Sequence, residues 1–337
     1  MSDADADVSI RVALYGATGA LGREVLLALE GHAIPVESLV AVGGVQSAGK
    51  EAYWRSQPVT VVGEQHVDID DLDVAILATP ALESERLRGV LIDAGVFVID
   101  LSGGRGERAL PLVWPTFELS GLETHPGGVA LPCGVANALA PLLRVFSDFG
   151  AIADLDVGVM TSAQSAGRRG EEELSAQTLA LLNQRLPSAG VFGGVLAFNV
   201  LPGSARATLE GDPLALAAHQ EIGRLLPALE LGSASIRVVQ IPVFAGMAFM
   251  VRVAFEGKGP SRESLVEIFD AHDELRLIPA GGRLALRDTM ERDAVFLSEL
   301  SLSDAGVLHV FVATDPLHRS AWASATVLER VLAEDLW

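Results

Sequence analysis

Val12–Gly22 reads VALYGATGALG, and this stretch decides the fold of the first part of the chain. Its glycines fall at Gly16, Gly19 and Gly22, with the spacing G-x-x-G-x-x-G. An apolar run precedes them and predicts a strand, and a helical pattern at Leu21–Glu30 follows. In this context the first glycine permits a tight turn, the second lets a pyrophosphate approach the backbone, and the third allows close helix–strand packing. The alternative is a strand–helix turn that binds no ligand.

Outward from this loop, short apolar runs alternate with helical patterns. Strands are predicted at Val8–Tyr15, Leu39–Val42, Val74–Ala78 and Val96–Leu101, with a helix at about Ser84–Asp93. Strands that alternate with helices form a parallel sheet with helices packed against it. We therefore predict an α/β fold with a Rossmann-type, doubly wound parallel sheet.

The pattern changes after about residue 130. The expected elements are helices at Gly134–Phe146, Glu171–Leu186, Pro213–Leu226 and Arg319–Leu336, and longer strands at Ile152–Met160, Ser235–Phe244, Phe249–Phe255 and Gly306–Thr314. Helices mixed with longer, alternating strands indicate an α+β domain. We predict a nucleotide-binding domain at 1–130, an α+β domain at 131–315, and a C-terminal helix at 316–337 that packs back on the first domain.

The glycine loop predicts where a dinucleotide binds, because the amide end of the following helix attracts phosphate. The second strand ends without the carboxylate that usually contacts the ribose of NAD. It also lacks an arginine for the 2′-phosphate of NADP, and offers Gln46, Ser47 and Lys50 instead. The predicted cofactor-binding residues are Gly16, Thr18, Gly19, Ala20, Leu21, Gly22, Gln46 and Ser47.

Composition excludes several classes of partner. Acidic residues outnumber basic ones 44 to 24, for a formal charge of −20. Phosphate backbones need a basic face, so nucleic acid and anionic membranes are not expected partners. The acidic N-terminus, Met1–Asp7, does not resemble a signal peptide, and the single cysteine excludes an internal disulfide, so we expect a cytoplasmic protein. The seven histidines show no metal-ligand spacing, so no metal site is predicted.

That cysteine, Cys133, opens the helix predicted at Gly134–Phe146. A thiol at a helix N-terminus can have its thiolate stabilised by the amide dipoles, as in a nucleophile that forms thioesters. A free cysteine is also often a small buried core residue. The sequence alone leaves both interpretations open.

Together these segments resemble the aspartate-semialdehyde dehydrogenases and their semialdehyde dehydrogenase superfamily. The matching segments are Val12–Gly22, Ser47–Gly49, Leu131–Leu142, Leu196–Pro202 (LAFNVLP), Ile241–Gly246 (IPVFAG) and the C-terminal helix. The resemblance implies a homodimer that binds NADP in the first domain. It also implies that Cys133 attacks an aldehyde, that hydride passes to NADP, and that phosphate resolves the thioester.

The chain departs from the family at the positions that support this chemistry. Met247 stands where the family has its acid–base histidine, and Gln240 stands where an arginine binds the substrate carboxylate. Thr161 replaces a glutamine, and Pro316 replaces an asparagine on the nicotinamide side. The pattern resembles a Usg-type paralogous subgroup that keeps the fold without the full catalytic set. It predicts a thiol with no proton partner.

Two hypotheses follow from the resemblance. In the first, the chain is a family homodimer that retains the NADP-binding scaffold and Cys133 but is not an aspartate-semialdehyde dehydrogenase, and is non-catalytic. In the second, it is an active NADP-dependent reductase of another semialdehyde or acyl phosphate, such as N-acetylglutamyl phosphate. Arg105 lies near a substrate- or phosphate-binding arginine of the family, and His219 and His318 are candidates to replace the missing base.

Overall fold

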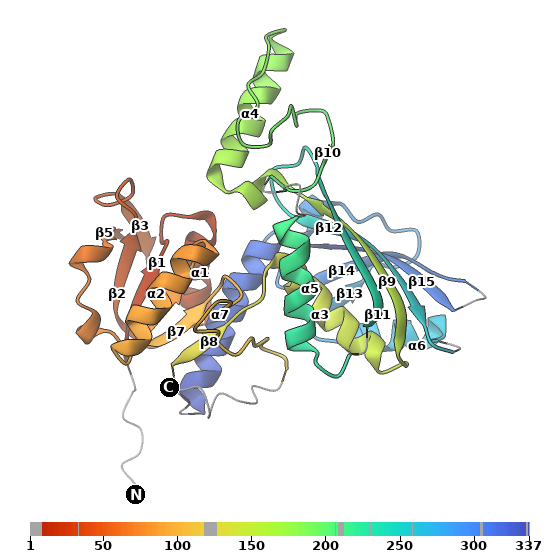
Figure 1. The fold of residues 1–337 in the computed structure, drawn as a ribbon, viewed down its shortest axis with the longest axis horizontal. Helices are drawn as coiled ribbons and strands as arrows, with labels where there is room; N and C mark the ends of the chain where they lie inside the picture. The colour runs from red at the N-terminus through yellow and green to blue at the C-terminus, as the bar shows by residue number, and fades with distance from the viewer. Residues whose placement is uncertain are drawn as a thin grey trace, which may run out of the picture. The chain divides into compact units, whose positions relative to one another are not determined.

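The structure is a computed structural model of the 337-residue chain. It describes residues 9–32, 34–117, 127–205, 207, 212–229, 231–257, 259–303, 306–334 and 336. The acidic segment 1–7 lies outside the described residues. The chain divides into two compact units: the first comprises residues 1–132 and 320–337, and the second comprises residues 133–319 (Figure 1).

A six-stranded parallel sheet forms the first unit, in the order β5-β2-β1-β6-β7-β8. The strands are β1 (Ile10–Tyr15), β2 (Val36–Gly43), β5 (Val62–Gly63), β6 (Val74–Leu77), β7 (Phe97–Asp100) and β8 (Gly128–Ala130). Helices α1 (Ala20–Gly31) and α2 (Ala81–Asp93) connect them, and a hairpin of β3 (Glu51–Trp54) and β4 (Gln57–Thr60) follows β2. The continuous apolar runs are buried along their length, as expected for parallel strands covered on both faces. The predicted α/β class is confirmed.

The sheet reverses its order beside β1. This strand pairs with β2 on one side and β6 on the other, and the chain crosses between them through β2 and the hairpin. Ligands of such sheets bind beyond the carboxyl ends of the strands at this switch point. The glycine loop leaves β1 at that edge.

The second unit contains a mixed seven-stranded sheet in the order β10-β11-β9-β12-β15-β14-β13. Its strands are β9 (Ile152–Thr161), β10 (Leu201–Pro202), β11 (Leu231–Gln240), β12 (Met247–Phe255), β13 (Leu275–Leu277), β14 (Val295–Leu302) and β15 (Val307–Thr314). Its helices are α3 (Gly134–Ser147), α4 (Arg168–Leu182), α5 (Pro213–Leu225) and α6 (Arg262–Ala271). Helix α7 (Pro316–Ala333) begins in this unit and ends in the first.

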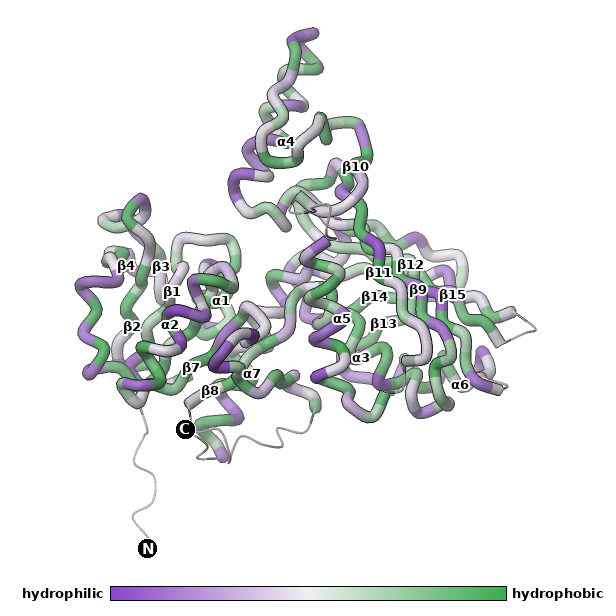
Figure 2. The backbone as a smooth tube through the Cα atoms, in the orientation of Figure 1, coloured by the Kyte–Doolittle hydropathy of each residue, from purple (hydrophilic) through white to green (hydrophobic). Residues whose placement is uncertain are grey.

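Helix α3 lies in the core of the second unit. Its residues are buried on nearly every side, and Phe146 makes edge-to-face contacts with Phe255 and Phe269 at ring-centre distances of 6.0 and 6.3 Å. A helix that is apolar all round is stable only when it is buried in this way. Hydrophobic residues are concentrated in the strands of both sheets (Figure 2).

Some predicted boundaries were wrong. Helix α4 covers Arg168–Leu182 rather than Glu171–Leu186, because Gly167 is its N-cap and the helix ends before Gln184, which adopts a left-handed backbone conformation. Strand β11 ends at Gln240 rather than Phe244, since Pro242 has no amide to continue the ladder. Among the described residues, no helix is both long enough and apolar enough to cross a bilayer.

Candidate functional site

The glycine loop of the first unit is built for close backbone contacts. Gly16 has φ of 83°, and a Cβ there would lie 2.4 Å from the carbonyl oxygen of Ala78. A Cβ on Gly22 would lie 2.3 Å from the carbonyl oxygen of Gly16. Both positions therefore require glycine for steric reasons. These observations match the roles that the sequence predicted for the two residues.

The N-terminus of α1 presents backbone amides. Within the described part of the chain, no side chain caps this end, and the first turn carries no acidic residue. The first turn of a helix leaves unpaired N–H groups that suit an anion. Gly19, Ala20, Leu21 and Gly22 thus lie at the amide end of α1, and their contact with a phosphate stays a prediction.

The loop after β2 contacts the glycine loop. The Thr18 hydroxyl donates to Ser47 Oγ at 3.0 Å, so two predicted cofactor residues lie together. Gln46 and Lys50 are exposed on the same loop. Sequence reasoning missed Arg23, whose guanidinium donates to the carbonyl of Thr18 at 2.8 Å. The sequence feature that could have indicated Arg23 is the position of a cation directly after Gly22.

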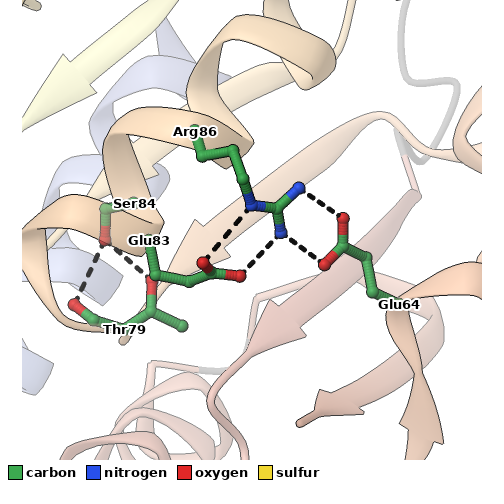
Figure 3. Close-up of polar contacts among 5 residues, drawn as sticks. All are labelled: Glu64, Thr79, Glu83, Ser84 and Arg86. Carbon is green, nitrogen blue, oxygen red and sulfur yellow. Dashed lines mark hydrogen bonds and ion pairs between the residues drawn. The ribbon is translucent and has the colours of Figure 1, made fainter.

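The turn after β6 packs against the glycine loop, and its polar contacts fix the start of α2 (Figure 3). The hydroxyls of Thr79 and Ser84 lie 2.7 Å apart, and Ser84 Oγ donates to the carbonyl of Thr79. Arg86 bridges two carboxylates, Glu83 at 2.6 Å and Glu64 at 2.5 Å. The charge of Arg86 is thereby matched by acids of its own unit.

A buried ion pair holds the turn that follows β7. Arg88 and Asp100 are fully buried, with Nη1 and Oδ2 2.5 Å apart. Asp100 also accepts from the amide of Ser102 at 2.8 Å, and Arg88 donates to the carbonyl of Arg105. The pair therefore fixes the backbone of the segment that carries Arg105.

In the second unit, Cys133 is the N-cap residue of α3. Its own amide donates to the carboxylate of Glu221 on α5 at 2.7 Å. Glu221 is fully buried and lies close enough to the thiol of Cys133 to affect its pKa. The sequence predicted a thiol without a proton partner, and the structure places the carboxylate of Glu221 beside the residue that carries it. Sequence reasoning missed Glu221 because nothing local relates it to a cysteine 88 residues earlier.

The charge state of the sulfur follows from these neighbours. Cys133 is half-buried, and this burial raises the pKa of its thiol well above the usual range, while the nearby Glu221 carboxylate raises the pKa further. The amides of Val135 and Ala136 act in the opposite direction and are outweighed. The amides at this helix end therefore do not by themselves lower the pKa of the thiol, and the role of Cys133 as a nucleophile stays a prediction.

We expect iodoacetamide to modify Cys133 more slowly at neutral pH than it modifies a free thiol. A raised pKa means that the reactive thiolate forms only as the pH rises above the ordinary thiol range. Mass spectrometry of the intact protein measures the rate, and Cys133→Ala supplies the blank because the chain has one cysteine. A rate at neutral pH above that of a free thiol would contradict the expectation.

The positions at which the sequence departs from the family lie together in the sheet. Thr161 of β9 pairs with Gln240 of β11 on one side and with Met247 of β12 on the other. Gln240 and Thr161 are buried, and Gln240 Nε2 donates to the carbonyl of Thr161 at 3.0 Å. Among the residues that the structure describes, the hydroxyl of Thr161 and Oε1 of Gln240 have no hydrogen-bond partner. One row of the sheet thus holds the threonine, the glutamine and the methionine.

The same row reaches the start of α3. A Cβ on Gly134 would lie 3.6 Å from Cε of Met247 and 2.8 Å from Cβ of Pro316. Met247 and Pro316 thus lie next to the residue that follows Cys133. A thioether and a pyrrolidine ring transfer no proton. Within the described residues, no cluster of histidine, cysteine and carboxylate side chains could hold a metal ion.

Comparisons with known proteins cover both units. Residues 11–124 match the family model described as "Semialdehyde dehydrogenase, NAD binding domain", and residues 139–319 match "Semialdehyde dehydrogenase, dimerisation domain". An aspartate-semialdehyde dehydrogenase of Rickettsia bellii is 27% identical over 92% of this chain and 94% of that protein. A USG-1 protein homolog of Pseudomonas aeruginosa is 25% identical over 96% of this chain and 97% of its own.

A solved structure shows the same fold. It is aspartate semialdehyde dehydrogenase II from Vibrio cholerae, described as complexed with ASA, and it superposes with a TM-score of 0.89. The alignment covers 98% of this chain and 100% of that one, at 23% identity.

Proposed function

The chain belongs to the semialdehyde dehydrogenase family, and on this premise we propose that it is a homodimeric, NADP-binding member that is not an aspartate-semialdehyde dehydrogenase and is non-catalytic. The observation that carries the proposal is the row of Gln240, Thr161 and Met247 beside the start of α3. The resemblance assigns proton transfer and carboxylate binding to two of these positions. Methionine cannot transfer a proton, and neutral glutamine cannot balance a carboxylate.

The cofactor proposal rests on the first unit. Gly16 and Gly22 leave space that a Cβ would fill, and the uncapped amides of α1 suit a pyrophosphate. A bound NADP would supply a hydride acceptor at this edge of the sheet. Gln46 and Ser47 hydrogen-bond a 2′-phosphate more weakly than a guanidinium would, so we propose weak affinity.

The homodimer is supported by the second unit. One face of its sheet carries exposed side chains, among them Met250, which is 63% exposed in the middle of β12. An apolar side chain at the centre of a sheet is commonly covered by a partner. The match to a dimerisation domain favours a second copy as that partner. The single cysteine and the acidic composition favour a cytoplasmic location.

One observation favours the alternative, an active NADP-dependent reductase with another semialdehyde or acyl phosphate as substrate. Cys133 retains a carboxylate partner in Glu221, so its proton has an acceptor despite the loss of the histidine. Such an enzyme would not bind a substrate carboxylate through Gln240.

We expect no phosphate-dependent formation of NADPH when the protein is mixed with aspartate semialdehyde and NADP. An acid–base residue contributes about 10²–10⁴-fold, and a charged hydrogen bond about 1.5–3 kcal/mol. Together their loss lowers turnover by at least about 10³-fold. NADPH absorbance measures the rate, and a family enzyme with both residues is the positive control. Turnover that Cys133→Ala abolishes would contradict the proposal, and oxidation of NADPH by N-acetylglutamyl phosphate would favour the alternative.

A further inference from the structure

We propose that Glu221 is the proton partner of Cys133: its carboxylate holds the negative charge of the pair, keeps the sulfur as a thiol, and accepts the thiol proton when the sulfur bonds to an electrophile. This goes beyond the proposed function and holds whether or not the chain turns over a substrate.

The carboxylate of Glu221 lies beside the start of α3. Helix α5 packs against α3, and Glu221 is fully buried on α5. Its Oε2 accepts from the amide of Cys133 at 2.7 Å, which brings the carboxylate next to the thiol of the same residue. A buried carboxylate thus contacts the backbone of Cys133 directly and lies near enough to its thiol to raise the pKa of that thiol.

The carboxyl group of Glu221 and the thiol of Cys133 compete for one negative charge. A helix N-terminus stabilises one anion through its amides. Here two acids compete for that end, a carboxyl and a thiol, and two adjacent negative charges in a buried place disfavour each other. The carboxyl group is the stronger acid by several pKa units in ordinary surroundings. The carboxylate therefore takes the charge, and the sulfur keeps its proton.

The thiol proton of Cys133 has to leave the sulfur when an S–C bond forms. When the sulfur attacks an aldehyde carbon, the S–H bond breaks, the S–C bond forms, and the carbonyl oxygen receives an electron pair. Glu221 accepts the proton and can return it to that oxygen, which gives a hemithioacetal without any oxidant. With iodoacetamide the same S–C bond forms, iodide leaves, and the proton remains with the carboxylate or passes to water.

The other charged groups of the unit near α3 and α5 have separate roles. Arg319 contacts α3 through the carbonyl of Asn137 at 3.0 Å, and its charge is balanced by Glu274 at 2.7 Å. On the strand packed against α5, Arg237 pairs with Asp156 at 2.7 Å. The remaining groups on these helices are the exposed His219, the half-buried Arg224, and Arg144 paired with Asp148.

The test is the pH dependence of alkylation in Glu221→Gln. Glutamine keeps an oxygen for the amide of Cys133 and removes the charge that faces the sulfur. We expect the midpoint of the alkylation profile to move to lower pH, and the rate of reaction with iodoacetamide at neutral pH to rise at least about tenfold. Glu267→Gln removes the same charge from an exposed site on α6 and should leave the profile unchanged. A midpoint that stays in place or moves up in Glu221→Gln would overturn the proposal.

A second measurement needs no variant that alters Glu221. Because the chain has one cysteine, its infrared spectrum contains one S–H stretching band, which Cys133→Ala removes. We expect this band in the wild-type protein to lie below the frequency of a free thiol, owing to the hydrogen bond to a carboxylate. We also expect it to persist at pH values where an ordinary thiol has ionised. Loss of the band in the ordinary thiol range would refute the pairing even if Glu221→Gln failed to fold.

Discussion

Arg88→Met is expected to lower the free energy of unfolding of the first unit by about 3–5 kcal/mol. Arg88 and Asp100 are both fully buried and lie 2.5 Å apart. Removing the guanidinium leaves the carboxylate without its counter-charge in a place that water does not reach, and this is the costly way to break a buried pair. The turn up to Arg105 also loses a hydrogen bond to its carbonyl. Chemical denaturation followed by circular dichroism measures the change.

Arg86→Met is the matched control, since it makes the same substitution two residues earlier on the same helix. Arg86 also contacts carboxylates, but its side chain is 48% exposed (Figure 3). Exposed ion pairs contribute about 0–1 kcal/mol because water solvates the charges that remain. The two variants should therefore differ by at least about 2 kcal/mol. Equal losses of unfolding free energy in the two variants would show that removing Arg88 does not leave the Asp100 carboxylate buried without a counter-charge.

The first unit could be predicted in detail because its signals are local. The glycine spacing and the alternation of apolar runs with helical patterns lie within short windows of sequence, and each parallel strand is a continuous hydrophobic run. The contacts of Gly16 and Gly22 then follow from the turn that their spacing requires. The predicted end of β11 was wrong because Pro242 has no amide to continue the ladder, so the strand ends at Gln240.

The second unit was less predictable at its site because the relevant contacts are distant in sequence. Thr161, Gln240 and Met247 align across three strands only when the register is known. Glu221 lies 88 residues after Cys133, on a helix whose sequence shows only an amphipathic pattern. From the sequence alone, a glutamate in such a helix is expected to be exposed to solvent. Only the packing of α5 against α3 shows that Glu221 is buried.

Glu221, which sequence reasoning missed, bears on the effect of having Met247 where the family has a histidine. The departures at Met247 and Gln240 could be read from the sequence, and they argue against the family's reaction. The contact of Glu221 with the backbone of Cys133 could not be predicted from the sequence, and it places a carboxylate near the sulfur. Under our proposal this carboxylate, and not a histidine, sets the charge state of the thiol.

The glycine loop gives the second large effect: Gly16→Ala is expected to destabilise the first unit by about 2–5 kcal/mol and to abolish NADPH binding. A left-handed conformation costs an L-residue about 1–2 kcal/mol, and overpacking costs about 1–3 kcal/mol more. The overpacking arises because the new Cβ would lie 2.4 Å from the carbonyl oxygen of Ala78, a backbone atom that cannot rotate away. If the turn moves to relieve the contact, the amides of α1 move with it. NADPH fluorescence titration and chemical denaturation measure the two effects.

Gly31→Ala is the control for adding a methyl group to a glycine of the same unit. Gly31 is the last residue of α1, its φ lies outside the left-handed region, and a Cβ there would meet no atom within 4 Å. Because alanine favours a helix over glycine by up to about 1 kcal/mol, this variant should be at least as stable as the wild-type chain. It should also bind NADPH as the wild-type does. If Gly16→Ala behaves like Gly31→Ala, the loop is not under steric constraint and the assignment of the nucleotide site to it fails.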